Sequence, residues 1–492
     1  MPIVQRFRAA LLPVLTVTAL VLSGCSSAPV ADGPSGASGL PGSSAPSGPS
    51  GSSGSGVTGA SAGGSAGSTP AGPQSSTAAP ASGAASGPAS PDSGTGTGSA
   101  SPVSGSASGS ASPDSGTATG SSSPRDGIGP DGCITHFDPE ADYFPDKARL
   151  EYATNFTIDY HRSYAVLTVQ QPSQGAKPAS YVLVRCGAPT PQLSGALAKD
   201  QQVTVPVHSL FSGSTTQLPS LVMLDRLDVL TGVAFKAFVS ETPVVQHISS
   251  PDVVQYADAA GTVDAERVVA AKPDVLVTGG FDDPAYANII KAGVPVLSDA
   301  DWLENDPLGR AEWIKFFGAL TDTQAAAGRQ FDSIVDAYQR LQKLAAPAAK
   351  VSVVTGQPYQ GTWYVPGGGS YTARLIADAG GTYPWASDPS TGSIATDVET
   401  VFARSGTAPV WLASTTWTTT KQALAENATF AKFTAFATGN VWNAAKDVNS
   451  AGGNNFYELG AARPDLILGD LVAILHPDLL PDHEFAFYLK LS

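Results

Sequence analysis

Hydroxyl-bearing side chains gather in the segment that follows a predicted strand at 203–207. The residues most able to contact a ligand there are Ser209, Phe211, Ser212, Ser214 and Thr215. A strand followed by such a turn and a helix start presents hydroxyls and backbone N–H groups at a sheet edge, which suits a ligand rich in hydrogen-bond acceptors. The alternative is an ordinary capped loop between a strand and a helix.

A second candidate segment combines aromatic side chains with a glycine run at 367–369, where the backbone can approach a ligand closely. Its candidate ligand-binding residues are Trp363, Tyr364 and Tyr371, and the loop residues Trp417 and Tyr457 are further candidates. Core packing is the rival interpretation of Trp363.

Catalytic motifs are missing from the sequence. It contains no GxSxG, no HExxH and no P-loop, and its six His residues are scattered singly. His208 stands beside Ser209, but adjacent side chains at a strand end diverge, which disfavours a nucleophile and base pair. We therefore predict no enzyme activity, no catalytic residue, no cofactor and no resident metal. A protein that binds free zinc or manganese is an alternative, and it would need carboxylates, His476 or His483 to complete the ligands of the earlier His residues.

The N-terminus predicts export. Arg6 and Arg8 precede an apolar run at 9–22, which is too short to span a bilayer and ends in Leu22-Ser-Gly-Cys25. This ending resembles the lipobox of bacterial lipoproteins, which implies a signal peptide at 1–24, lipidation of Cys25 and attachment to the outer face of the cell membrane. A cleaved, secreted protein is the alternative.

Residues 25–126 are almost entirely Ser, Gly, Ala, Pro and Thr, so they lack the apolar side chains that a core needs. We predict a disordered tether.

The formal net charge of −15 argues against nucleic acid and anionic lipid as partners. In an oxidising compartment, the two remaining cysteines, Cys133 and Cys186, are expected to form a disulfide.

The remainder predicts an α/β protein. Strands are expected at 164–169, 181–184 and 203–207, followed by an alternation of short apolar strands and helices that is typical of parallel sheets. Thr321-Asp-Thr-Gln324 matches a capping box, and apolar residues at helical spacing predict one long helix from Thr321 to Leu344.

Two local repeats connect the two halves. Asp264-Ala-Glu266-Arg-Val268 matches Asp397-Val-Glu399-Thr-Val401, and a weaker echo pairs 461–468 with 270–277, where Pro and then Asp would lead into a parallel strand. Two lobes built to one plan would explain these matches.

The chain resembles the class III periplasmic-type binding proteins of ABC importers. The resemblance is carried by these residues and by the segments 262–274, 306–315 and 460–478. The resemblance covers about 203–492 and implies two Rossmann-like lobes joined by one long helix, with a ligand cleft between them. The expected parts are an N-terminal β-rich elaboration at 127–202, an N-lobe at 203–306, connector helices at 307–346 and a C-lobe at 347–492.

The same resemblance implies a partner and a ligand. Glu266 and Glu399 correspond to the acidic lobe-tip residues that dock on an importer permease dimer. The expected ligand is a chelated metal, with a ferric siderophore first and a corrinoid second, bound by a monomer. A first-turn Glu is also common without any partner. A cell-wall adhesion module would fit the long tether equally well, but it would not need the paired glutamates.

Overall fold

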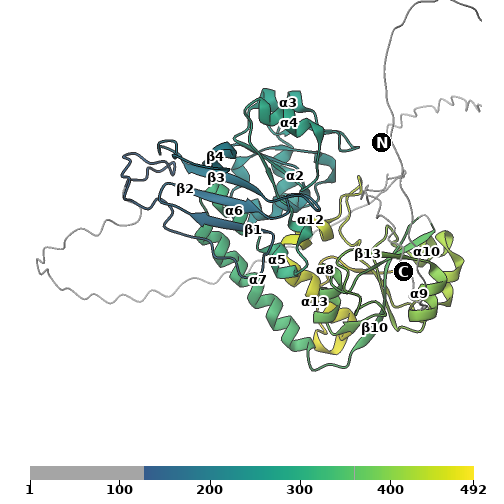
Figure 1. The fold of residues 1–492 in the computed structure, drawn as a ribbon. Coiled ribbons are helices and arrows are strands. Elements are labelled where there is room, and N and C mark those ends of the chain that lie inside the picture. The colour runs from purple at the N-terminus through teal and green to yellow at the C-terminus, as the bar shows by residue number, and fades with distance from the viewer. Residues whose placement is uncertain (1–126, 360) are drawn as a thin grey trace, which may run out of the picture. The chain divides into compact units, whose positions relative to one another are not determined.

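The computed structural model describes residues 127–359 and 361–492, which belong to one compact unit of the chain (Figure 1). The predicted signal peptide, Cys25 and the predicted tether lie outside the described residues.

A four-stranded sheet comes first, in the order β1-β2-β3-β4. Its strands are β1 (Phe156–Tyr160), β2 (Tyr164–Val169), β3 (Ala179–Arg185) and β4 (Gln201–Val205). β1 to β3 are antiparallel, whereas β4 runs parallel to β3. The strand predicted at 203–207 is therefore β4, but it completes this sheet rather than opening the next one, because it hydrogen-bonds to β3. A disulfide joins Cys186, directly after β3, to Cys133.

The second sheet is entirely parallel, in the order β7-β6-β5-β8-β9. Its strands are β5 (Leu210–Ser212), β6 (Leu230–Val233), β7 (Val254–Gln255), β8 (Val275–Thr278) and β9 (Val296–Ser298). The helices of this part are α1 (Leu218–Met223), α2 (Thr242–Ile248), α3 (Ala265–Ala271) and α4 (Pro284–Lys291). All four residues of β8 are buried, as expected for a strand covered on both faces.

The third sheet has the order β13-β11-β10-β14-β15-β16, and β12 also pairs with β10. Its strands are β10 (Val351–Tyr359), β11 (Thr362–Pro366), β12 (Gly381–Thr382), β13 (Ser393–Thr396), β14 (Val410–Ala413), β15 (Val441–Asn443) and β16 (Leu489–Lys490). β10, β12, β14 and β15 are parallel, as predicted for this half, and the remaining pairs are antiparallel.

The helices of the last part are α8 (Tyr371–Asp378), α9 (Val398–Ser405), α10 (Thr420–Glu426), α11 (Thr434–Ala437), α12 (Asn455–Ala462) and α13 (Pro464–Leu475). The prediction from the weaker repeat, 461–468, is wrong. Pro464 begins α13 instead of leading into a strand, and Asp465 lies in its first turn, where it pairs with Arg463.

The two halves are connected by α5 (Pro307–Ala311), α6 (Ile314–Thr321) and α7 (Gln324–Ala345), and α7 packs against α6 and α13 (Figure 1). The predicted long helix exists, but its capping box is wrong. Thr321 is the last residue of α6, and its hydroxyl donates to the Phe317 carbonyl. Asp322 has a left-handed φ of 58° that ends α6, so α7 begins at Gln324.

Two buried carboxylates fasten the N-terminal segment to this connection. Glu312 accepts hydrogen bonds from the backbone N–H groups of Glu151, Tyr152 and Ala153 at 2.7–3.1 Å, and it pairs with buried Lys315 at 2.7 Å. Glu304 accepts from the N–H groups of the next two residues, 154 and 155. A buried carboxylate is tolerated only when it is paired and hydrogen-bonded, and both conditions hold for Glu312.

Glu312→Ala should therefore destabilise the protein by about 3–5 kcal/mol, because it leaves three backbone N–H groups without their acceptor and the buried Lys315 ammonium without its counter-charge. Chemical denaturation of the full chain measures this loss. Glu140→Ala, which removes an exposed pair with Arg162, is the matched control and should change the unfolding free energy by less than about 0.5 kcal/mol. Equal effects of the two substitutions would contradict the anchoring role.

Candidate functional site

A cavity of about 270 Å³ opens at the carboxyl ends of β10 and β14. Thr355 and Gly356 line it from β10, and Ala413 and Ser414 line it at the end of β14. Its other walls are aromatic and aliphatic, and they include Tyr364, Phe456, Tyr457, Tyr488, Leu375 and Leu471. Ligands of open α/β sheets bind outside the carboxyl ends of the strands, so this cavity lies where such a site is expected.

A second cavity of about 220 Å³ adjoins the first and shares Pro366, Thr372 and Ser393 with it. One side is formed by the segment that follows β9, with Trp302, Glu304, Asn305 and Arg310, and the other side by the segment around α8, with Ser370, Tyr371 and Thr372. The two cavities together offer aromatic faces, hydroxyl groups and one guanidinium.

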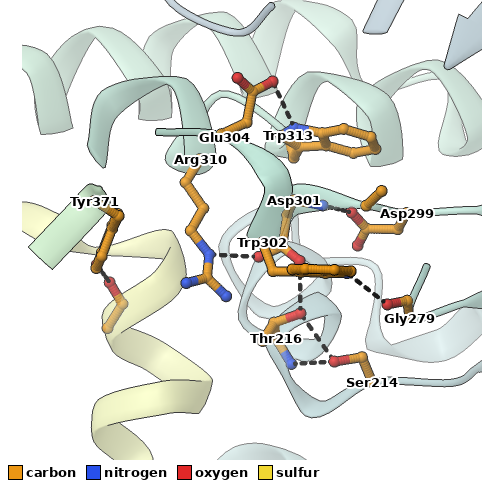
Figure 2. Close-up of polar contacts among 12 residues, drawn as sticks. Ser214, Thr216, Gly279, Asp299, Asp301, Trp302, Glu304, Arg310, Trp313 and Tyr371 are labelled. Atoms are coloured by element: carbon orange, nitrogen blue, oxygen red, sulfur yellow. Dashed lines mark hydrogen bonds and ion pairs between the residues drawn. The ribbon is translucent and has the colours of Figure 1, made fainter. Parts of the chain in front are cut away.

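The guanidinium belongs to a polar network of the first half and the connection, and it lies beside the Tyr371 ring of α8 (Figure 2). Arg310 Nε donates to Asp301 Oδ2 at 2.7 Å, and Thr216 Oγ1 donates to Asp301 Oδ1 at 3.4 Å. The Asp301 N–H donates to Asp299 Oδ1 at 3.1 Å. Burial, and then the charge of Asp301, raises the pKa of Asp299 well above its usual range. The Asp301 carboxylate and the Arg310 guanidinium form a largely buried ion pair beside it.

The predicted hydroxyl turn is placed differently from the sequence expectation. Ser209 lies just before β5, at the end of the sheet away from both cavities, and its Oγ contacts Thr231 Oγ1. Ser212 is buried, and its hydroxyl donates to Gln217 Oε1. Ser214 caps the 3₁₀ turn Thr215–Gln217. This arrangement is the ordinary capped loop that was the alternative interpretation of the segment. Neither Ser214 nor Thr215 lines the two cavities. These hydroxyls order the loop itself.

Three predicted aromatic ligand contacts are core residues. Phe211 is buried and stacks on Tyr256. Trp363 is 1% exposed, stacks on Trp411 with 5.3 Å between ring centroids, and donates from Nε1 to the Thr355 carbonyl. Trp417 is also buried. Trp363 packs in the core because the side chains of β11 alternate and this one faces inward.

The other three aromatic candidates do line the cavities. Tyr364 is the outward neighbour of Trp363 on β11. Tyr457 is half exposed, and its hydroxyl lies 2.6 Å from Ser414 Oγ. Tyr371 lines the second cavity at the start of α8, and its ring lies 5.3 Å from the Arg310 guanidinium carbon. The assignment of these residues to ligand binding stays a prediction.

Sequence reasoning missed Arg310, Asp301, Thr372 and Ser393 as residues of the site. The available signal for Arg310 was its position in the turn of α5 that follows an Asp-Pro helix start. No local pattern indicates that its guanidinium meets α8, because that contact depends on how the two halves pack.

Glu266 and Glu399 occupy matching positions. Each is exposed in the first turn of its helix, α3 or α9, behind an Asp N-cap whose carboxylate accepts from the backbone N–H three residues later. Their docking role stays a prediction.

A hydrogen-bonded contact holds the two halves together beyond the cavities. Glu458 of α12 accepts from the N–H groups of Ser240 at 2.7 Å and Glu241 at 3.0 Å. Asn449 Nδ2 donates to the carbonyls of Ala237 and Val239. Burial, and then the Glu458 charge, raises the pKa of Glu241 to about 7.

In the described ranges 127–359 and 361–492, no helix has the length and apolar character to cross a membrane. Over the same ranges, His, Cys, Asp and Glu side chains do not form a group of three or more that could hold a metal ion.

Comparison with known proteins finds matches to one family. Residues 221–448 match the family model described as "Periplasmic binding protein". Two relatives from Methanocaldococcus jannaschii are both named uncharacterized lipoproteins. One is 31% identical over 230 residues, 46% of this chain and 53% of the relative, so the match spans about half of that relative's length. The other is 25% identical and covers 70% of this chain and 87% of the relative.

Solved structures with a similar fold include a possible iron-binding (periplasmic solute-binding) protein from Staphylococcus epidermidis, at 15% identity and a TM-score of 0.44 over 55% of this chain and 99% of that chain. A periplasmic heme binding protein from Pseudomonas aeruginosa has 17% identity and a TM-score of 0.43 over 55% of this chain and 93% of that chain.

Trp363→Ala should lower the unfolding free energy by about 3–5 kcal/mol, because it empties a buried site between aromatic rings. Denaturant unfolding measures the change. The milder Trp363→Phe should remain folded and bind ligand as tightly as the wild type. A stable Trp363→Ala protein with weakened ligand binding would instead restore the ligand-contact interpretation.

Proposed function

We propose that this chain is an extracytoplasmic solute-binding protein that captures a chelated metal and delivers it to an ABC importer. The match of residues 221–448 to the periplasmic binding protein family supports this proposal. A ferric siderophore is the first choice of ligand. On this proposal the chain acts by binding and release, as a non-enzymatic member of a family of solute-binding proteins, and works as a monomer with a permease dimer.

The observation that carries the proposal is the pair of adjoining cavities between the carboxyl end of the third sheet and the segment after β9. Together they reach the lower part of the range of about 300–1,000 Å³ that is usual for small-molecule sites. Tyrosine rings, hydroxyl groups and aliphatic side chains make up most of their walls, and these groups bind an organic shell better than a bare metal ion.

The mode of attachment is part of the same proposal. Cys25 would carry the lipid, and residues 25–126 would separate the folded part from the membrane. The names of the two Methanocaldococcus relatives, both lipoproteins, support this assignment. A single lipid chain gives only marginal membrane binding, and the diacylglycerol of a lipoprotein supplies two chains.

Titration of the full chain with ferric siderophores, haem, cobalamin and free metal salts tests the ligand class. A bound chelate should quench the emission of Trp302, which lines the second cavity, and the quench should saturate. Calorimetry supplies the affinity independently. The matched control Trp302→Phe should reduce the quench much more than the affinity. Tight binding of Zn²⁺ or Mn²⁺ without any chelate would overturn the proposal.

Charge reversal at the two helix starts tests delivery. Glu266→Arg combined with Glu399→Arg should abolish uptake of the ligand while its affinity for the soluble protein changes less than twofold, because both side chains are exposed and line neither cavity. Uptake by cells and calorimetry of the purified variant give the two readings. Reversal of Glu484, an exposed glutamate that lines neither cavity, is the control and should leave both unchanged. Undiminished uptake by the double variant would remove the docking assignment.

A further inference from the structure

A loop of the second half, between β15 and α12, closes on the segment that follows β6 in the first half. The Asn449 amide donates from Nδ2 to the Ala237 carbonyl at 3.0 Å and to the Val239 carbonyl at 2.9 Å. Glu458, at the start of α12, accepts from the backbone N–H groups of residues 240 and 241. We call residues 237–241 and 449–458 together the latch, because these bonds exist only while the two halves touch.

The latch closes tightly at Gly453. A Cβ atom at this position would lie 2.1 Å from the Phe238 carbonyl oxygen, which is closer than a Cβ approaches any atom in a real structure. The Gly453 N–H also donates to Asn449 Oδ1 at 2.9 Å, and this bond directs the Asn449 Nδ2 toward the first half. A side chain at position 453 would therefore hold the two halves apart.

Two carboxyl groups meet at the latch. Glu458 is 1% exposed, and its oxygens accept from the Ser240 N–H at 2.7 Å and from the Glu241 N–H at 3.0 Å. An ionised carboxylate is the stronger acceptor for such bonds. Glu241 Oε2, in contrast, is a buried atom that has no hydrogen-bond partner in the described part of the chain. A buried charge without a partner is costly, so Glu458 keeps the negative charge and Glu241 takes up a proton.

The other titratable groups of the packed elements do not neutralise Glu241. The nearby basic groups have other partners: Lys236 donates to the Ser250 carbonyl, Lys446 donates to the Phe485 carbonyl, His247 Nε2 contacts the Leu230 carbonyl, and Arg463 pairs with Asp465. Helix α1, which packs on α2 and α12, contains no titratable residue. The charges that act here are therefore negative, Glu458 on Glu241 and Asp447 on Glu458.

We propose that the latch is a pH-dependent conformational device, which is held closed while Glu241 carries a proton and is loosened when loss of that proton places a second negative charge beside Glu458. The latch itself needs no ligand. Its consequence, easier opening of the cavities at higher pH, regulates the same site and rests on the proposed solute-binding function.

The direction of the effect follows from the protonation of Glu241 in the two states. The ordinary pKa of a Glu carboxyl is 4.5, and burial, followed by the Glu458 charge, raises the pKa of Glu241 to about 7 in the closed latch. An open latch returns the carboxyl to water and to its ordinary pKa. Between these two values the open state alone is ionised, so closure weakens by at most about tenfold per pH unit as the pH rises. Above about pH 7 both states are ionised, and closure stays at its weakest.

Hydrogen–deuterium exchange of the full chain tests the latch without any ligand. The readout is the protection of the Ser240 and Glu241 N–H groups, corrected for the intrinsic exchange rate at each pH. In the wild-type chain this protection should fall about five- to tenfold between about pH 6 and about pH 8. Glu241→Gln is neutral at every pH, and it should keep the higher protection throughout.

Three controls separate the latch from general unfolding. Glu484→Gln, at an exposed glutamate, should retain the fall of the wild type. Gly453→Ala should already have low protection at about pH 6, because its Cβ would collide with the Phe238 carbonyl, and little pH dependence should remain. The N–H groups of residues 151–153, which donate to Glu312, are the internal reference and should stay protected in every variant.

The outcomes are decisive for the latch. Protection of residues 240 and 241 that stays constant or rises with pH in the wild type would overturn the inference, and so would a fall that persists in Glu241→Gln. Neither result affects solute capture, because no ligand is present. Conversely, failure of the chain to bind any metal chelate would overturn the proposed function and leave the pH dependence of the latch standing.

Discussion

The burial of the Glu312 carboxylate is the constraint on which the arrangement of the chain depends. A buried negative charge is tolerated only with a complete set of partners, and Glu312 obtains them from Lys315 on α6 and from the backbone at 151–153. These partners come from distant parts of the sequence, so they are satisfied together only when the N-terminal segment is docked on the connection between the halves. Glu304 extends the same contact to residues 154 and 155.

The short segment 301–315 therefore serves two purposes. Glu304, Glu312 and Lys315 hold the N-terminal segment, whereas Trp302 and Arg310 line the second cavity. Glu304 also lines that cavity, but its oxygens already accept bonds from residues 154, 155 and Trp313. Its charge is therefore directed toward the protein. Rigid support of this kind limits the movement of a binding group to small distances.

Local sequence patterns predicted the parts of the fold that local physics determines. The strands predicted at 164–169 and 181–184 and the end of the long helix predicted at Leu344 lie close to where the pattern placed them, because each element shows its own periodicity. The end of α6 was missed because Asp322 adopts a left-handed conformation, which moves the start of α7 from the predicted Thr321 to Gln324.

The residues of the site were less predictable, because the alternation of side chains along a strand decides which of them face the cavity. Trp363 and Tyr364 are neighbours of similar composition and were predicted together, yet the pairing of β11 between β10 and β13 turns one into the core and the other into the first cavity. A one-residue change of register would exchange them. The register depends on β13, which follows about thirty residues later in the chain, so no window around Trp363 contains the information.

The contact of Asn449 and Glu458 with residues 237–241 determines how much free energy is needed to separate the two halves around this site. Its hydrogen bonds run from side chains of one half to backbone groups of the other. Each contributes about 0.5–1.5 kcal/mol net, and those to the Glu458 carboxylate about 1.5–3 kcal/mol, so separating the halves costs several kcal/mol. A ligand bound at micromolar affinity supplies about 8 kcal/mol. The contact is thus weak enough for a ligand to compensate, yet strong enough to hold the halves close in its absence. The wall formed by Tyr371 and the wall formed by Arg310 then face each other before binding, and the affinity of the site depends less on reorganisation than on the groups that line it.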